Sequence, residues 1–172
     1  MDLQDKFGAT IFDDLMTSST IKGTDLDASK EATRISLGLS SLGYSVVRIK
    51  IETSYTHPSV PTISNGKTMP KDCYWECHLN VKCNNELLPK LQEFARLNGV
   101  HISKNVFKRL SGDWFTIMLT DRVYEGTYDD FKDRIDTLVS KLTPIYDLEK
   151  QIVEFALFDS KINHDSTWLD QK

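Results

Sequence analysis

The stretch YWECHLNV, residues 74–81, alternates between apolar and polar side chains and decides the fold. In an extended strand, successive side chains point to opposite sides, so an alternating stretch can bury one side only. The apolar side consists of Trp75, Cys77, Leu79 and Val81, and the other side of Tyr74, Glu76, His78 and Asn80. We therefore predict a strand over residues 72–82 with chemically reactive groups on its polar side.

The segments that follow this strand predict the order β-α-β-β-α-β. Turn residues and apolar spacing indicate helices over 84–99 and 127–142 and strands over 100–108, 114–122 and 151–159. This order is typical of the ferredoxin-like α+β fold, in which two helices cover one face of a four-stranded antiparallel sheet. We predict this fold for residues 72–159.

A helix over 27–42 and a strand over 44–53 are expected before this core. The spacing of Ala28, Ala32, Ile35, Leu39 and Leu42 is helical, whereas the strand would bury Val47, Ile49 and Ile51. We predict that this helix and strand form an N-terminal extension, which adds to the sheet at an edge.

The chain length of 172 residues is typical of a single domain, so we predict one domain over 1–172. Within it, 1–53 is the extension, 54–71 a long loop with three prolines, 72–159 the core and 160–172 a polar tail. The net charge of −4 argues against nucleic acid as a partner. No apolar stretch is long enough for a membrane span.

Three cysteines, Cys73, Cys77 and Cys83, indicate reduced thiols and a cytoplasmic location. Their spacing matches no common zinc motif, and two of them share the apolar side of the strand with Trp75. We therefore expect them to be small buried side chains, and we predict no metal and no other cofactor.

The polar face of the sheet is the candidate site. His78 and His101 fall on it from strands that are separated by one other strand, about 9–10 Å apart. One imidazole of such a pair can remove a proton while the other donates one, so we predict His78 and His101 as catalytic residues. The candidate substrate-binding residues on this face are Arg48, Lys50, Glu76, Asn80, Ser103, Asn105, Thr116 and Thr120.

A histidine pair beside Arg48 and Lys50 suits a phosphate ester, because cations stabilise charge on phosphoryl oxygens. The tripeptide His101-Ile-Ser103 resembles the His-x-Ser/Thr motif of the 2H phosphoesterase family, whose members pair two such motifs across a sheet cleft. His78-Leu-Asn80 lacks the hydroxyl, and both tripeptides lie in one βα unit rather than in two halves. We predict binding and hydrolysis of a phosphate ester or nucleotide.

Other functions fit the same face. Glu76, His78 and His101 are the donor set of a two-histidine, one-carboxylate metal site. RNA binding is disfavoured because the central positions of this face carry His, Asn, Ser and Thr instead of the aromatic side chains on which RNA bases stack. A non-enzymatic module that sequesters a small ligand or binds a protein stays open, as does a face covered by water or by a second copy in a homo-oligomer.

Overall fold

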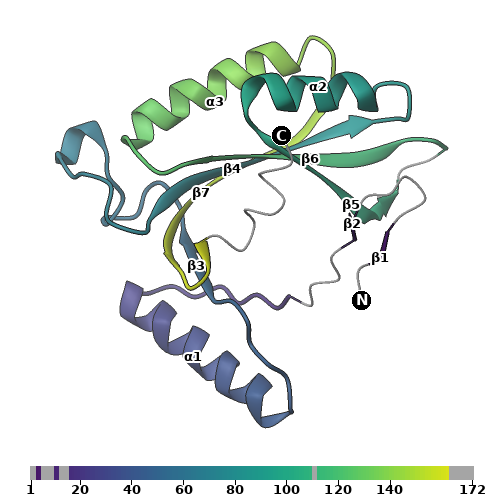
Figure 1. Ribbon diagram of the computed structural model, residues 1–172. Coiled ribbons are helices and arrows are strands. Elements are labelled where there is room, and N and C mark those ends of the chain that lie inside the picture. The colour runs from purple at the N-terminus through teal and green to yellow at the C-terminus, as the bar shows by residue number, and fades with distance from the viewer. Residues whose placement is uncertain (1–2, 5–9, 12–15, 110–111, 163–172) are drawn as a thin grey trace. The chain divides into compact units, whose positions relative to one another are not determined.

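The computed structural model describes residues 3–4, 10–11, 16–109 and 112–162, with the side chains of 3–4, 10–11 and 104–109 outside the described set (Figure 1). It has mixed helix and strand content. The chain divides into two compact units, Met1–Ser45 and Val46–Lys172, and each is described by itself. In the described ranges, no helix combines the length and the apolar character that a membrane crossing requires.

The first unit contains the helix α1, Asp25–Ser41, and two short paired strands, β1 (Leu3–Gln4) and β2 (Thr10–Ile11). Thr24 caps α1 by accepting from the backbone of Asp27, whose carboxylate accepts from Thr24 in return. The predicted helix is therefore present.

The predicted apolar stripe of α1 is only half-buried, and no residue of this helix is fully buried. Leu42, which we expected to end the stripe, lies beyond the helix as its C-cap and is 73% exposed. The prediction for Leu42 was wrong because the helix ends one residue before it.

The second unit is built on an open antiparallel sheet of five strands in the order β3-β7-β4-β6-β5. The bounds are β3 Lys50–Thr53, β4 Tyr74–Cys83, β5 His101–Arg109, β6 Phe115–Val123 and β7 Leu148–Asp159. As predicted, the strand before the long loop joins the sheet at an edge, beside β7.

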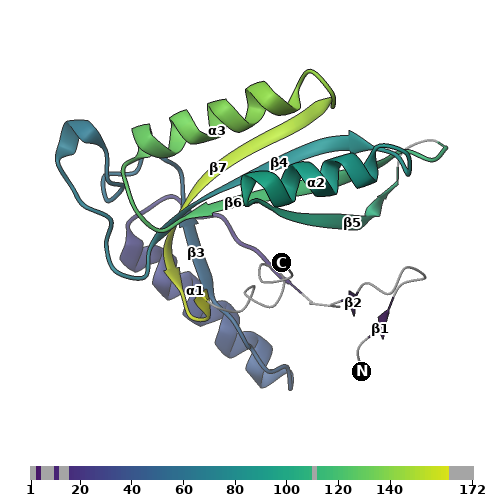
Figure 2. The same cartoon turned by 45° about the horizontal axis from the view of Figure 1, so that its top comes forward.

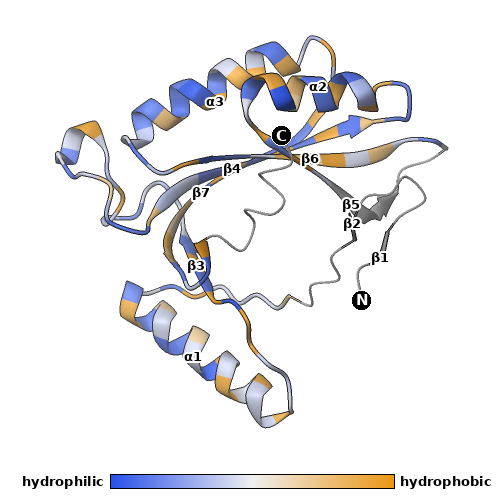
Figure 3. Ribbon diagram, in the orientation of Figure 1, coloured by the Kyte–Doolittle hydropathy of each residue, from blue (hydrophilic) through white to orange (hydrophobic). Residues whose placement is uncertain are grey.

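Two helices, α2 (Leu88–Asn98) and α3 (Tyr128–Leu142), lie on the same face of this sheet (Figures 1 and 2). Both alternate between hydrophobic and hydrophilic residues, as helices with one face on a core do (Figure 3). A short 3-10 helix, η1 (Ile63–Asn65), interrupts the long loop. Thr127 caps α3 through reciprocal hydrogen bonds with Asp130.

The apolar side of β4 forms the centre of the core. Its side chains are at most 2% exposed: Trp75, Cys77, Leu79 and Val81. Trp75 packs against Phe131 of α3 and Phe155 of β7, with ring centroids 5.7 and 4.7 Å away. The three cysteines are buried, as expected. The apolar side of β4 is thus buried as predicted, but Tyr74 and Glu76 on its polar side are buried as well, at 0% and 3% exposed.

The strand predicted over 44–53 is shorter than expected. Pairing of β3 with β7 begins where Lys50 lies opposite Asp159, the last residue of β7. Residues before Lys50 therefore lack a partner strand, and Val47 is 55% exposed instead of buried. Alternation predicts a side for each residue only as far as a neighbouring strand extends.

Candidate functional site

His78, Thr120 and His101 lie in one row across three adjacent strands. Thr120 of β6 is the register partner of His78 on β4 and of His101 on β5. Register partners project to the same side of a sheet, so all three side chains share the face opposite α2 and α3. The two histidines are separated by two strand spacings, about 9–10 Å. We call these three residues the histidine row.

His78 contacts polar side chains at both ring nitrogens. Its Nδ1 is hydrogen-bonded to Oγ1 of Thr120 at 3.0 Å, and its Nε2 lies 3.3 Å from Oε1 of Glu76, within ion-pair distance. A carboxylate oxygen beside Nε2 favours the tautomer that carries the proton on this nitrogen. Nδ1 then accepts from the Thr120 hydroxyl.

The imidazole of His78 is neutral near pH 7. Burial lowers the pKa of His78 below its ordinary value of 6.5, and the nearby carboxylate of Glu76 opposes this shift only in part. The side chain is 18% exposed, so it is less open than the sequence suggested. One edge of the ring nevertheless remains accessible.

Glu76 is the centre of a buried ionic network. Its carboxylate lies 2.7 Å from Nζ of Lys50 and 3.1 Å from Nη2 of Arg122. The guanidinium of Arg122 also stacks 4.6 Å from the ring centroid of Tyr74. Sequence reasoning missed Arg122, although it continues the period-two pattern of Thr116 and Thr120 along β6.

A second ionic cluster lies where β7 ends. Asp159 accepts from Nε of Arg48 at 2.9 Å and from the Tyr74 hydroxyl at 2.7 Å. Burial alone would raise the pKa of Asp159, but the hydrogen bonds from Arg48 and Tyr74 lower it to about 2. Burial and the same hydrogen bond raise the pKa of Tyr74. Sequence reasoning assigned no role to Asp159 or Tyr74.

Both cations predicted to bind phosphate are therefore engaged by carboxylates. Arg48 is held by Asp159, and Lys50 contacts both Glu52 and Glu76. These pairs fix the positions of the two cations, and they also neutralise much of their charge.

The other predicted site residues are more dispersed. Thr116 donates to Glu149 at 2.8 Å, and Ser103 donates to the backbone carbonyl of Met118 at 3.5 Å. Asn80 is half-buried on the same face, two positions beyond His78 on β4. The side chain of Asn105 lies outside the described residues. Among the predicted residues whose side chains are described, Lys50, Glu76, His78 and Thr120 are joined by direct contacts, and His101 shares the register of Thr120.

Negative charge is concentrated on one side of the histidine row. Glu52 and Glu154, on β3 and β7, have side chains that are 32% and 31% exposed. Burial and the neighbouring Glu52 raise the pKa of Glu154. On the β5 side, the described side chains near the row are imidazole and hydroxyl groups of His101 and Ser103. An anionic ligand would therefore meet less repulsion over β6 and β5.

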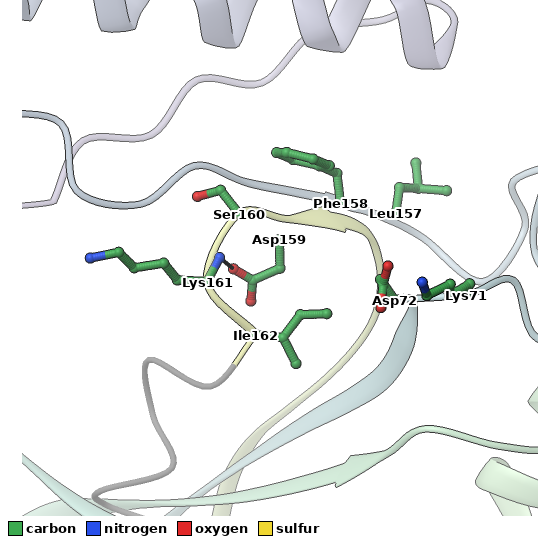
Figure 4. Close-up of a pocket in the computed structure, with 8 residues that line it drawn as sticks. All are labelled: Lys71, Asp72, Leu157, Phe158, Asp159, Ser160, Lys161 and Ile162. Carbon is green, nitrogen blue, oxygen red and sulfur yellow. Dashed lines mark hydrogen bonds between the residues drawn. The ribbon is translucent and has the colours of Figure 1, made fainter.

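A cavity of about 640 Å³ lies away from this row, around the end of β7 (Figure 4). Asp159 and Ile162 point into its centre, while Phe158 and Lys161 point outward. Along β7, Asp159 is about 23 Å from Ile152, the residue that pairs with His78. Besides Asp159, which accepts from the backbone N–H of Lys161 at 3.0 Å, the cavity is lined by Lys71, Asp72, Leu157, Phe158, Ser160, Lys161 and Ile162.

The described part of the chain contains no group of three or more His, Cys, Asp or Glu residues arranged to hold a metal ion. In comparisons with known proteins, the chain matches no family model, no curated protein and no solved structure.

Proposed function

We propose that this chain binds a small phosphorylated ligand or a nucleotide on the polar sheet face, at the histidine row. The observation that carries the proposal is the common register of His78, Thr120 and His101, with Lys50 and Arg122 on the same face. Imidazole groups can donate to phosphoryl oxygens, and the paired cations fix Glu76 and, with it, the surroundings of His78.

We also propose that residues 72–159 have the ferredoxin-like topology. The strand order β7-β4-β6-β5 supports it, because the fourth and third strands of that fold flank the first and the second lies at the edge. The position of both helices on one face supports it further (Figure 2). The open face of such a sheet is then the surface available to a ligand.

The electrostatic environment favours a nucleotide over inorganic phosphate. A phosphoryl group can lie over β6 and β5, where the His101 imidazole offers a donor. The exocyclic amino group of a base can meanwhile donate to the exposed carboxylates of Glu52 or Glu154 on the other side. Such a ligand would use both halves of this face.

Binding can be tested by calorimetric titration with adenosine monophosphate, with adenosine as the uncharged control. We expect the monophosphate to bind and His101→Gln to weaken it about tenfold, the effect of one charge-assisted hydrogen bond. His57→Gln is the matched control because His57 lies in the long loop, outside the sheet. Equal affinity for adenosine, or equal loss in both variants, would contradict the proposal.

A second candidate is a non-enzymatic interaction module, which includes a homo-oligomer contact. The observation that favours it is the pairing of Arg48 and Lys50 with carboxylates, since a surface of fixed ion pairs suits another protein surface. If no phosphorylated compound binds and light scattering shows concentration-dependent self-association, this candidate replaces the first.

A further inference from the structure

We propose that Thr120 is the nucleophile of a phosphoryl-transfer reaction, with His78 as its general base and His101 as the acid for the leaving group. This inference rests on the proposed binding of a phosphate ester, and adds a residue role and a reaction to it. The carrying observation is that Thr120 lies between the two histidines in the sheet register.

The hydrogen bonds around His78 orient the Thr120 hydroxyl for this role. Oγ1 of Thr120 and Nδ1 of His78 are 3.0 Å apart, and Nε2 of His78 is 3.3 Å from Glu76. Because the carboxylate of Glu76 beside Nε2 favours the proton on that nitrogen, the lone pair on Nδ1 faces the hydroxyl and can take its proton. A nucleophile, a base and a carboxylate that orients the base are the elements of an activated hydroxyl.

Three features of the environment assist the same reaction. The lowered pKa keeps His78 neutral, the form that a base requires. Glu76 is fixed by Lys50 and Arg122, so the imidazole cannot turn without breaking several contacts. Arg122 is two positions from Thr120 on the same face of β6, about 7 Å along the strand, so the nucleophile's own strand also carries a residue that fixes Glu76.

The reaction would proceed in two balanced steps. In the first, a bond forms between Oγ1 of Thr120 and phosphorus while the bond from phosphorus to the leaving oxygen breaks. The hydroxyl proton passes to Nδ1 of His78, and His101 gives a proton to the leaving oxygen. In the second, water attacks phosphorus, His101 takes a proton from that water, and His78 returns its proton to Oγ1 as phosphate departs.

The test uses an aryl phosphonofluoridate, which forms a stable bond from a reactive hydroxyl to phosphorus and releases fluoride. The full-length chain is incubated with this probe, and the labelled residue is located by tandem mass spectrometry. We expect labelling of Thr120 in the wild type and in Thr120→Ser, and none at this position in Thr120→Val. His78→Gln should label about 10²–10⁴ times more slowly.

Thr137→Val, which removes an exposed hydroxyl on α3, is the matched control and should label as the wild type does. If Thr120→Val fails to fold, two other results still test the role of Thr120. These are the position of the label in the wild type and the labelling rate of Thr120→Ser. Labelling at another residue, or none while adenosine monophosphate binds, overturns the role of Thr120 and leaves the proposed function standing. Absence of both labelling and nucleotide binding overturns both.

Discussion

Glu76 on β4 and Arg122 on β6 are register partners, joined by an ion pair of 3.1 Å between side chains that are only 4% and 7% exposed. Lys50 reaches the same carboxylate from the edge strand. One carboxylate therefore connects three strands of the sheet on the face that the helices leave uncovered. The polar side of the stretch YWECHLNV contributes Glu76 to this network, while its apolar side contributes to the core.

Replacement of Glu76 by Gln should destabilise the chain by about 3–5 kcal/mol, because two largely buried cations would lose their shared carboxylate. Urea unfolding measures this free energy. Glu93→Gln is the matched control: Glu93 pairs with Arg96 on exposed α2 positions, and its loss should cost less than about 0.5 kcal/mol. Similar losses in both variants would mean that the network contributes little.

Leu79→Ala should cost about 2–5 kcal/mol, since it leaves a cavity under α2 and α3 at a position that is 2% exposed. Leu97→Ala removes the same atoms from a 67% exposed position on α2 and should be close to neutral. The two free energies of unfolding are compared at one pH. A loss at Leu79 below about 1 kcal/mol would show that this side of β4 is not the core.

Asp159 should stabilise the fold in a pH-dependent way. Its pKa is about 2 in the folded chain and has an ordinary value of 3.8, so the folded state favours the ionised form. The stabilisation is complete above the ordinary value and is lost as the pH falls through the folded pKa; it amounts to about 2 kcal/mol. Asp159→Asn should therefore lower the free energy of unfolding most at neutral pH, and less as the pH falls toward the folded pKa. Tyr74→Phe should show the same trend more weakly. Urea unfolding at several pH values measures both.

His78 should make the fold less stable in mild acid. Burial lowers its pKa from 6.5, so the unfolded chain takes up a proton at a pH where the folded chain does not. The stability that the neutral imidazole of His78 contributes is therefore present above pH 6.5 and decreases as the pH falls below it. We expect the stability of His78→Gln to change less than that of the wild type between neutral pH and about pH 5. A larger pH dependence in the variant would contradict the assignment of a neutral imidazole.

Thr127→Ala should lower the free energy of unfolding by about 1 kcal/mol, because it removes the cap of α3 and its reciprocal bonds with Asp130. Thr127→Ser retains the hydroxyl oxygen and should lose much less. Thermal unfolding by circular dichroism distinguishes the two. An equal effect of both substitutions would assign the loss to the methyl group instead.

Most of the sheet could be predicted from the sequence because its strands combine period-two alternation with clear turn residues. The buried side of β4 and the edge position of β3 follow from local pattern and element order. Val47 shows the limit of this reasoning: its pattern is that of a strand, but burial depends on a partner strand that ends at Asp159. The local sequence around Val47 does not indicate where the partner strand ends.

The candidate site was predicted only in outline. The polar face and its histidines follow from alternation, whereas charge pairing depends on register between strands that are far apart in the sequence. Arg48 and Asp159 are more than a hundred residues apart, yet they form one ion pair. The sequence therefore predicts which groups share the face, but not that the cations are already bound by carboxylates.

The pairing of β3 with β7 also has a consequence for how the chain folds. Lys50 and Asp159 become neighbours only after most of the polypeptide has been made, since more than a hundred residues separate them. Contacts at such long range form slowly because closing a long loop costs chain entropy. We expect β4, β5 and β6 to associate first and the edge strand to join last during synthesis. Until then Arg48 and Lys50 remain hydrated, so their burial marks the completion of the sheet.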